Sequence, residues 1–265
     1  MFSTETIAAL SVGGVLAILI PVIAVIVFKK KNPDSWLPSV VIGAGTFIVF
    51  AMVLEQILHV IMLPIVKDNI IMYSVYGALA AGVFEETGRF VVYKTMMKKH
   101  YTTKNAVLMG LGHGGCEAII ALGITLFTFL VLAVMTNAIG LDKVLEMTAG
   151  GNPEVTETAK SQLESIREYN FISVAMGIYE RIVAMTFHVC MSVFVYKAVT
   201  QKGKILLYPA AVLLHALLDF PAAMYQAKAI TSIAVVYVIM TVFVALIVIS
   251  TVIMAKKMPD NGELR

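Results

Sequence analysis

The sequence predicts an all-α integral membrane protein, built as a bundle of about seven transmembrane helices. Of its 265 residues, 59% are hydrophobic and 14% are charged, whereas soluble domains have about 45–50% apolar and about 25% charged residues. Apolar runs long enough for a spanning helix, which needs about 20 residues, recur along the whole chain. The formal net charge is only +3 and the basic residues are scattered, so we expect no nucleic-acid partner.

Seven apolar runs form the predicted spans of a single transmembrane domain that covers residues 1–265. They are residues 4–28, 36–63, 69–97, 105–135, 170–196, 205–225 and 229–254. The first run is too long for the core of a signal peptide, lacks a small-residue cleavage site and stops at Lys29, so we expect it to remain as an anchor. Polar segments separate the runs, and the longest of them, residues 136–168, is acidic.

The lysines predict the orientation, because cytoplasmic loops carry an excess of basic residues. If the spans alternate, most basic residues fall on one side: Lys29, Lys30, Lys31, Lys94, Lys98, Lys99, Lys104, Lys197, Lys202, Lys204, Lys256, Lys257 and Arg265. The acidic loop at 136–168 falls on the other side. We therefore expect a multi-pass protein of the cell membrane with its N-terminus outside and its C-terminus in the cytoplasm.

The extracytoplasmic loop is expected to contain a short helix. Asn152-Pro153-Glu154 places a capping residue, a first-turn proline and an acid in the order that begins a helix. The predicted helix runs from Glu154 to Tyr169 and continues directly into the fifth span.

Ionisable side chains inside the spans are the main functional signal, since each costs roughly 2.5–3.5 kcal/mol in hydrocarbon on insertion scales. They lie in five of the predicted spans. In chain order they are Glu55 with His59, then Glu85-Glu86-Thr87-Gly88-Arg89, then Gly112-His113-Gly114-Gly115-Cys116-Glu117, then Glu180-Arg181 with Phe187-His188, then His215-Ala216-Leu217-Leu218-Asp219.

Helix rise places four of these residues at one depth. Counted from the cytoplasmic ends, they lie roughly 12–17 Å into the membrane, and they are Glu86, His113, His188 and His215. Glu117 and Asp219 follow His113 and His215 by four residues, and so lie one turn deeper on the same helix faces. Glu55 and His59 fall nearer the outer surface, so we exclude them from this layer.

A layer of three imidazoles with carboxylates suits a divalent metal, with zinc the expected ion. In this hypothesis His113, His188 and His215 bind the metal, while Glu117 and Asp219 are additional ligands or orient the histidines. Glu85 or Glu86 would act as the general base of a metal-assisted hydrolysis. Arg89, one turn from Glu85, would keep that carboxylate ionised and oriented.

Structural roles account for some of these residues. A single histidine in a membrane helix often only bonds a neighbouring helix, and we interpret Glu180 with Arg181 as a structural ion pair. The glycines around His113 are typical of close helix packing. Three histidines in one layer beside an acid pair are harder to explain by packing alone.

With these blocks in this order, the sequence resembles the YhfC-type intramembrane metalloproteases. These belong to the broader group of type II CAAX prenyl endopeptidases, bacteriocin-processing relatives and PrsW-like proteases. The resemblance covers most of the chain and implies a CAAX-protease-like helical bundle. It also implies that Glu85 or Glu86 activates water. The histidines at 113, 188 and 215 would hold the metal, with Asp219 nearby.

Two departures limit what the resemblance implies. The CAAX-type pattern has three residues between the acid pair and the arginine, whereas only Thr87 and Gly88 intervene here. The Phe-x-x-x-His block of that pattern is absent around His113. The base therefore stays open between the two glutamates, and a prenylated substrate is not implied.

The sequence thus favours an intramembrane metallopeptidase that acts on a membrane-embedded or lipid-anchored protein or peptide. One alternative is a transporter or channel that uses the same layer as a proton or metal pathway. Another is a non-catalytic membrane scaffold or immunity protein. A transporter should have broken helices at the midplane and access from both sides, whereas a hydrolase needs a metal, a water and a base in a one-sided cavity.

Overall fold

The protein is all-helical, as the computed structural model describes it for residues 1–150 and 152–260. Within the described residues, six helical segments are long and apolar enough to cross a membrane. The prediction of a polytopic helical membrane protein is therefore confirmed. Arg265, counted above among the cytoplasmic basic residues, lies outside the described residues.

The six candidate spans include two composite helices. The spans are α1 (Thr4–Lys31), α2 (Pro38–Phe47) with η1 (Ile48–Glu55) and α3 (Gln56–Val66), α5 (Thr103–Ala118) with η2 (Ile119–Ile124) and α6 (Thr125–Ile139), α9 (Phe171–Thr200), α10 (Leu207–Gln226), and α11 (Ile233–Lys257). η1 and η2 are π-helical segments within otherwise continuous helices. A further helix, α4 (Ile70–Lys94), is 25 residues long. Its sequence includes Glu85, Glu86 and Arg89, which lower its hydropathy.

The chain forms two compact units. Unit 1 comprises residues 1–22 and 117–182, and unit 2 comprises residues 23–116 and 183–265. Three long helices, α1, α5 and α9, have residues in both units.

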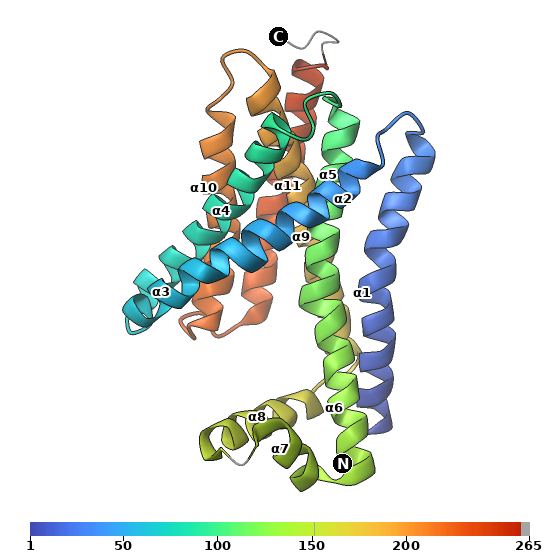
Figure 1. Cartoon of the computed structure of the whole chain (residues 1–265), viewed down its shortest axis with the longest axis vertical. Coiled ribbons are helices and arrows are strands. Elements are labelled where there is room, and N and C mark those ends of the chain that lie inside the picture. The colour runs from blue at the N-terminus through green and yellow to red at the C-terminus, as the bar shows by residue number, and fades with distance from the viewer. Residues whose placement is uncertain (151, 261–265) are drawn as a thin grey trace. The chain divides into compact units, whose positions relative to one another are not determined.

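Unit 1 has an apolar core in which a pair of short helices packs against α1 and α6. The pair is α7 (Leu141–Ala149) and α8 (Pro153–Arg167), which lie side by side near the end of α6 (Figure 1). Leu145 and Ile166 are buried in this core with Leu10 and Leu126. The N-terminus is held there by two hydrogen bonds between the Phe2 backbone and the Asn137 side chain, at 2.7 and 3.0 Å.

The helix expected in the loop is present, but it does not continue into the next span. Asn152 caps α8 by accepting from the backbone N–H of Glu154 at 3.0 Å, which agrees with the sequence signal. However, α8 ends at Arg167, and Asn170 starts α9 by accepting from the backbone of Ile172 at 2.9 Å. The cap at Asn170 makes α9 a separate helix. The sequence analysis did not predict the other short helix of the loop, α7.

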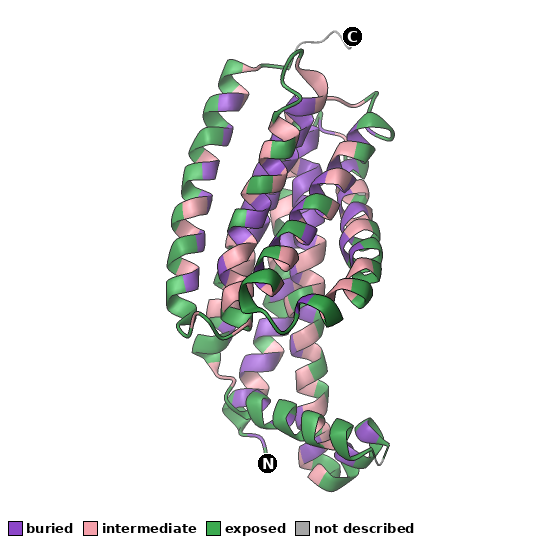
Figure 2. Ribbon diagram, turned by 90° about the vertical axis from the view of Figure 1, so that its left-hand side faces the viewer, coloured by how far each residue is buried: buried purple, intermediate pink, exposed green. Residues whose placement is uncertain are grey.

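Unit 2 places α4 against α10, with the composite helix α2–η1–α3 crossing α4 obliquely (Figure 1). Gly82 permits the contact of α4 with α10, since a Cβ atom there would lie 2.5 Å from the backbone oxygen of Val212. Gly112 permits the contact of α5 with α2, since a Cβ atom there would lie 2.0 Å from the backbone oxygen of Val40. In Figure 2 the buried residues of this unit lie on helix sides that face one another, and exposed residues cover the outside.

A short segment after α11 connects three helices of unit 2. The Asp260 carboxylate accepts from the backbone N–H of Thr103 at 2.7 Å, from Lys197 Nζ at 2.8 Å and from the Tyr196 hydroxyl at 2.9 Å. Lys197 is fully buried, so Asp260 neutralises a charge that would otherwise be costly. These bonds join the first turn of α5 to the last turns of α9.

We expect Asp260→Asn to lower the free energy of unfolding by about 1–2 kcal/mol, a figure reduced because Asp260 is itself partly exposed. Burial alone raises the pKa of Asp260, but the bonds from Lys197, Thr103 and Tyr196 outweigh it, so the pKa falls below its usual value. The stabilisation by the Asp260 carboxylate is therefore present above the pKa of Asp260 in the unfolded chain, about 3.9. It is lost as the pH falls through the pKa of Asp260 in the folded protein.

Thermal unfolding of the purified protein in detergent, at pH 7 and at about pH 3, measures both effects. Asp34→Asn is the control, because it removes an acid of the exposed Asp34–Lys104 pair and should not change the midpoint. Equal midpoints for Asp260→Asn and the wild type at pH 7 would contradict the prediction.

Candidate metal centre

The polar residues predicted to share a layer come together in unit 2. Glu85, Glu86 and Arg89 lie on α4, and the other helices contribute His113 from α5, His188 from α9, and His215 with Asp219 from α10. All except Asp219 are buried. Four helices thus converge on one cluster of ionisable side chains.

Glycines allow α5 to approach α9 closely enough for their histidines to meet. A Cβ atom on Gly110 would lie 2.5 Å from Val189 Cα, and one on Gly114 would lie 2.9 Å from Met185 Cα. The rings of His113 and His188 are consequently 5.0 Å apart, centroid to centroid. The glycine cluster noted in the sequence therefore brings two predicted ligands together.

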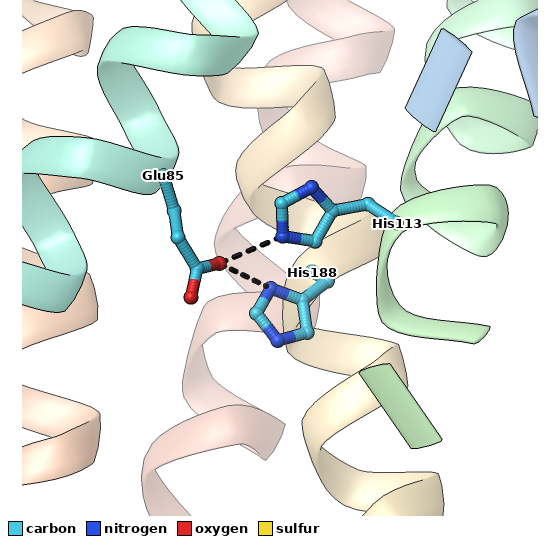
Figure 3. Close-up of side chains that lie close together, drawn as sticks. All are labelled: Glu85, His113 and His188. Atoms are coloured by element: carbon cyan, nitrogen blue, oxygen red, sulfur yellow. Dashed lines mark hydrogen bonds and ion pairs between the residues drawn. The ribbon is translucent and has the colours of Figure 1, made fainter. Parts of the chain in front are cut away.

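The Glu85 carboxylate is the centre of this cluster (Figure 3). Its Oε2 atom lies 2.7 Å from His113 Nε2 and 3.7 Å from His188 Nδ1. His215 Nε2 is nearly as close, at 3.8 Å. One ligand atom from each of Glu85, His113 and His188 lies within 4.8 Å of the other two. These three residues therefore form a compact set of possible metal ligands.

Glu86 has a different environment from its neighbour. One of its oxygens, Oε1, bonds Arg89 Nη1 at 2.5 Å and His215 Nδ1 at 2.7 Å. The other, Oε2, is buried and has no hydrogen-bond partner among the described residues. The two glutamates that the sequence could not distinguish are thus engaged by different groups.

The donor atoms and the charges fit a divalent cation. Two imidazole nitrogens and a carboxylate oxygen are a common ligand set for catalytic zinc. With neutral histidines, the carboxylates of Glu85, Glu86 and Asp219 outnumber the single cation, Arg89, by two charges. A divalent ion would reduce the excess of negative charge in the cluster. Arg89 Nη2 also lies 2.7 Å from His188 Nδ1, so a metal at that nitrogen would require Arg89 to release it, since a guanidinium can only donate.

The other two predicted residues have distinct surroundings. Asp219 Oδ2 lies 3.4 Å from His215 Nε2, which fits a role in orienting that histidine. Glu117 belongs to unit 1, where it accepts a 2.7 Å bond from Arg181. Arg181 also pairs with Glu180, as the sequence predicted. The assignment of Glu117 to the metal shell stays a prediction.

Glu55 was placed outside the layer by the depth count, yet it lies close to the cluster. It is buried, and its carboxyl group interacts electrostatically with Glu85, His215 and Asp219. The depth count assumed regular α-helix, whereas Glu55 ends the π-helical segment η1. Its isolation among apolar residues was the one signal in the sequence that could have found it.

Comparisons with known proteins identify the family of this chain. A family model described as the YhfC intramembrane metalloprotease matches residues 16–240. The membrane protein YhfC of Bacillus subtilis (strain 168), described as uncharacterized, is 34% identical over 253 residues, which are 93% of this chain and 95% of the relative. No solved structure matches the chain significantly. The extent of these matches shows that the chain belongs to the YhfC intramembrane metalloprotease family.

Proposed function

We propose that the protein is an intramembrane metallopeptidase that hydrolyses a peptide bond in a membrane-embedded or lipid-anchored protein or peptide. The observation that carries this proposal is the buried ligand set of Glu85, His113 and His188 beside a second carboxylate, Glu86. A ligand set next to a separate base is the minimum that metal-assisted hydrolysis requires.

In this proposal Glu85, His113 and His188 hold the metal, with zinc the expected ion. When bound, the metal would polarise the scissile carbonyl and favour ionisation of the attacking water. Phe47 packs edge-on to His113, with ring centroids 5.4 Å apart, and so restricts the motion of this ligand.

Glu86 is the general base in this proposal. Its Oε2 oxygen is free of hydrogen bonds among the described residues, so it can accept a proton from water as the water oxygen bonds to the carbonyl carbon. Glu86 then gives the proton to the leaving amine as the carbon–nitrogen bond breaks. Arg89 and His215 fix the other oxygen of Glu86 and hold the carboxylate in position.

The continuity of the spans favours this function over a transporter. Transporter sites commonly use helices that unwind at the midplane. In the described parts of the chain, the helices that carry the cluster run through it without an unwound segment. A scaffold without activity would not require a free carboxylate oxygen beside the ligand set, because a buried acceptor without a partner is costly.

We also propose the orientation that the lysines indicate, with the N-terminus outside and the C-terminus in the cytoplasm. The basic ends of α1, α4, α9 and α11 then lie on the cytoplasmic side. By helix rise, His188 lies nine residues before Lys197, or about 13 Å from that surface. The scissile bond would therefore lie in the cytoplasmic half of the membrane.

The ligand assignment predicts that single changes in the set abolish metal binding. His113→Ala, His188→Ala and Glu85→Gln should each reduce bound zinc from about one ion per chain to near background, since each removes one of three ligands. Elemental analysis of the purified variants measures this. His100→Ala, which changes a histidine that stacks on Trp36 away from the cluster, is the control and should retain zinc. Stoichiometric zinc in all three variants would refute the assignment.

Glu86→Gln should behave differently, because an amide is nearly isosteric but cannot accept the proton. We expect zinc content like that of the wild type and at least a hundredfold loss of peptidase activity, the usual order for a general base. Cleavage of co-expressed membrane proteins, followed by mass spectrometry of their fragments, measures activity. Full activity in this variant would exclude Glu86 as the base.

The orientation predicts which loops a membrane-impermeant thiol reagent can reach in intact cells. In a background without Cys116 and Cys190, single cysteines at Asp68 and Glu157 should react, and those at Lys99 and Lys202 should react only after the cells are opened. All four positions are exposed. The reverse pattern would overturn the proposed topology and the cytoplasmic access of the centre.

A further inference from the structure

A buried acid outside the ligand set, Glu55, lies beside the metal centre. It is the last residue of η1, a segment whose other seven residues are all apolar. Only Ala51 and Glu55 of this segment are buried, whereas Val53 and Leu54 are exposed. In a membrane helix, a charged residue that faces the bundle interior marks a functional site by default. π-Helical segments also occur frequently at such sites.

Two contacts fix how this helix aligns with α4. A Cβ atom on Gly88 would lie 2.7 Å from the Phe50 ring. Further along, His59 Nδ1 lies 2.7 Å from the Tyr76 hydroxyl. The two helices run in opposite directions, so Glu55, which lies between Phe50 and His59, is opposite the part of α4 between Tyr76 and Gly88, and this part includes Glu85.

The alignment agrees with the charges that Glu55 interacts with. Gly88 shares a helix face with Glu85, three residues before it, so η1 packs against the side of α4 that carries the ligand. The carboxyl group of Glu55 interacts electrostatically with Glu85, and also with His215 and Asp219 of α10. Glu55 thus faces the centre from a helix that provides none of its ligands.

Neighbouring side chains hold Glu55 in this position. His59 lies one turn further along the same helix face. Its Nε2 atom is 3.3 Å from Glu55 Oε1. Because the other ring nitrogen bonds Tyr76, His59 connects Glu55 to α4. The Tyr76 ring also packs edge-on to His59, with centroids 5.5 Å apart. Glu55, His59 and Tyr76 therefore form one polar chain that connects η1 to α4.

We propose that Glu55 is a positioning residue of the metal centre, whose carboxylate strengthens the binding of a divalent cation by Glu85, His113 and His188 without contacting it. The inference rests on the proposed function. His59 and Tyr76 hold the Glu55 carboxyl group in place against α4. A simple structural pair of Glu55 with His59 would stabilise the helix but would not affect cation affinity.

The test is the affinity of the purified full-length protein for Zn²⁺, measured in detergent by competition with a chromophoric chelator. We expect Glu55→Gln to weaken Zn²⁺ binding on the order of tenfold or more, because nearby charges interact strongly in a buried site. Tyr76→Phe, which removes only the hydroxyl that anchors His59, should weaken binding less. Glu55→Asp keeps the charge and should restore most of the affinity.

Glu180→Gln is the matched control, because it makes the same chemical change to an acid of unit 1 that pairs with Arg181. Its affinity should equal that of the wild type. If Glu55→Gln does not fold, Glu55→Leu replaces it, since leucine suits a membrane interior. Wild-type affinity in a folded Glu55→Gln or Glu55→Leu variant would overturn this inference alone. Failure of the wild type to bind Zn²⁺ would overturn both this inference and the proposed metal centre.

Discussion

The arrangement of unit 2 depends on one constraint, the burial of three ionisable side chains within five residues of α4. Glu85, Glu86 and Arg89 occupy a helix at membrane depth, where each charge costs roughly 2.5–3.5 kcal/mol on insertion scales. Arg89 compensates one acid, which leaves the other carboxylate to be satisfied from elsewhere. α5, α9 and α10 each direct a histidine at this segment. The polar cluster therefore determines which helices must pack against α4 and in what register.

Small residues make that register possible. Gly110 and Gly114 bring α5 onto α9, and Gly82 brings α10 onto α4. Any side chain at these positions would collide with backbone or Cα atoms of the facing helix. In a membrane, where lipid removes the hydrophobic drive for helix association, close backbone packing and interhelical hydrogen bonds hold a bundle together. The same glycines thus serve stability and bring the proposed ligands within reach of one another.

Much of this centre could be predicted from the sequence because charged residues are rare in spans and helix rise is regular. The depth count placed Glu86, His113, His188 and His215 together, and they do lie in one cluster. It did not distinguish Glu85 from Glu86, because side-chain direction depends on packing partners that the sequence alone does not supply. It failed for Glu55, because a π-helical segment and an oblique helix break the rule of 1.5 Å per residue. The loop helix α8 was predicted from its cap, whereas α7 has no such side-chain cap.

Zinc K-edge X-ray absorption spectroscopy of the zinc-loaded protein tests the central claim most directly, because it reports the atoms bound to the metal. We expect nitrogen and oxygen ligands at about 2.0–2.1 Å, with multiple scattering from two imidazole rings. Sulfur scattering from Cys116 or Cys190, or a spectrum without imidazole, would contradict the assignment of Glu85, His113 and His188 as the metal centre.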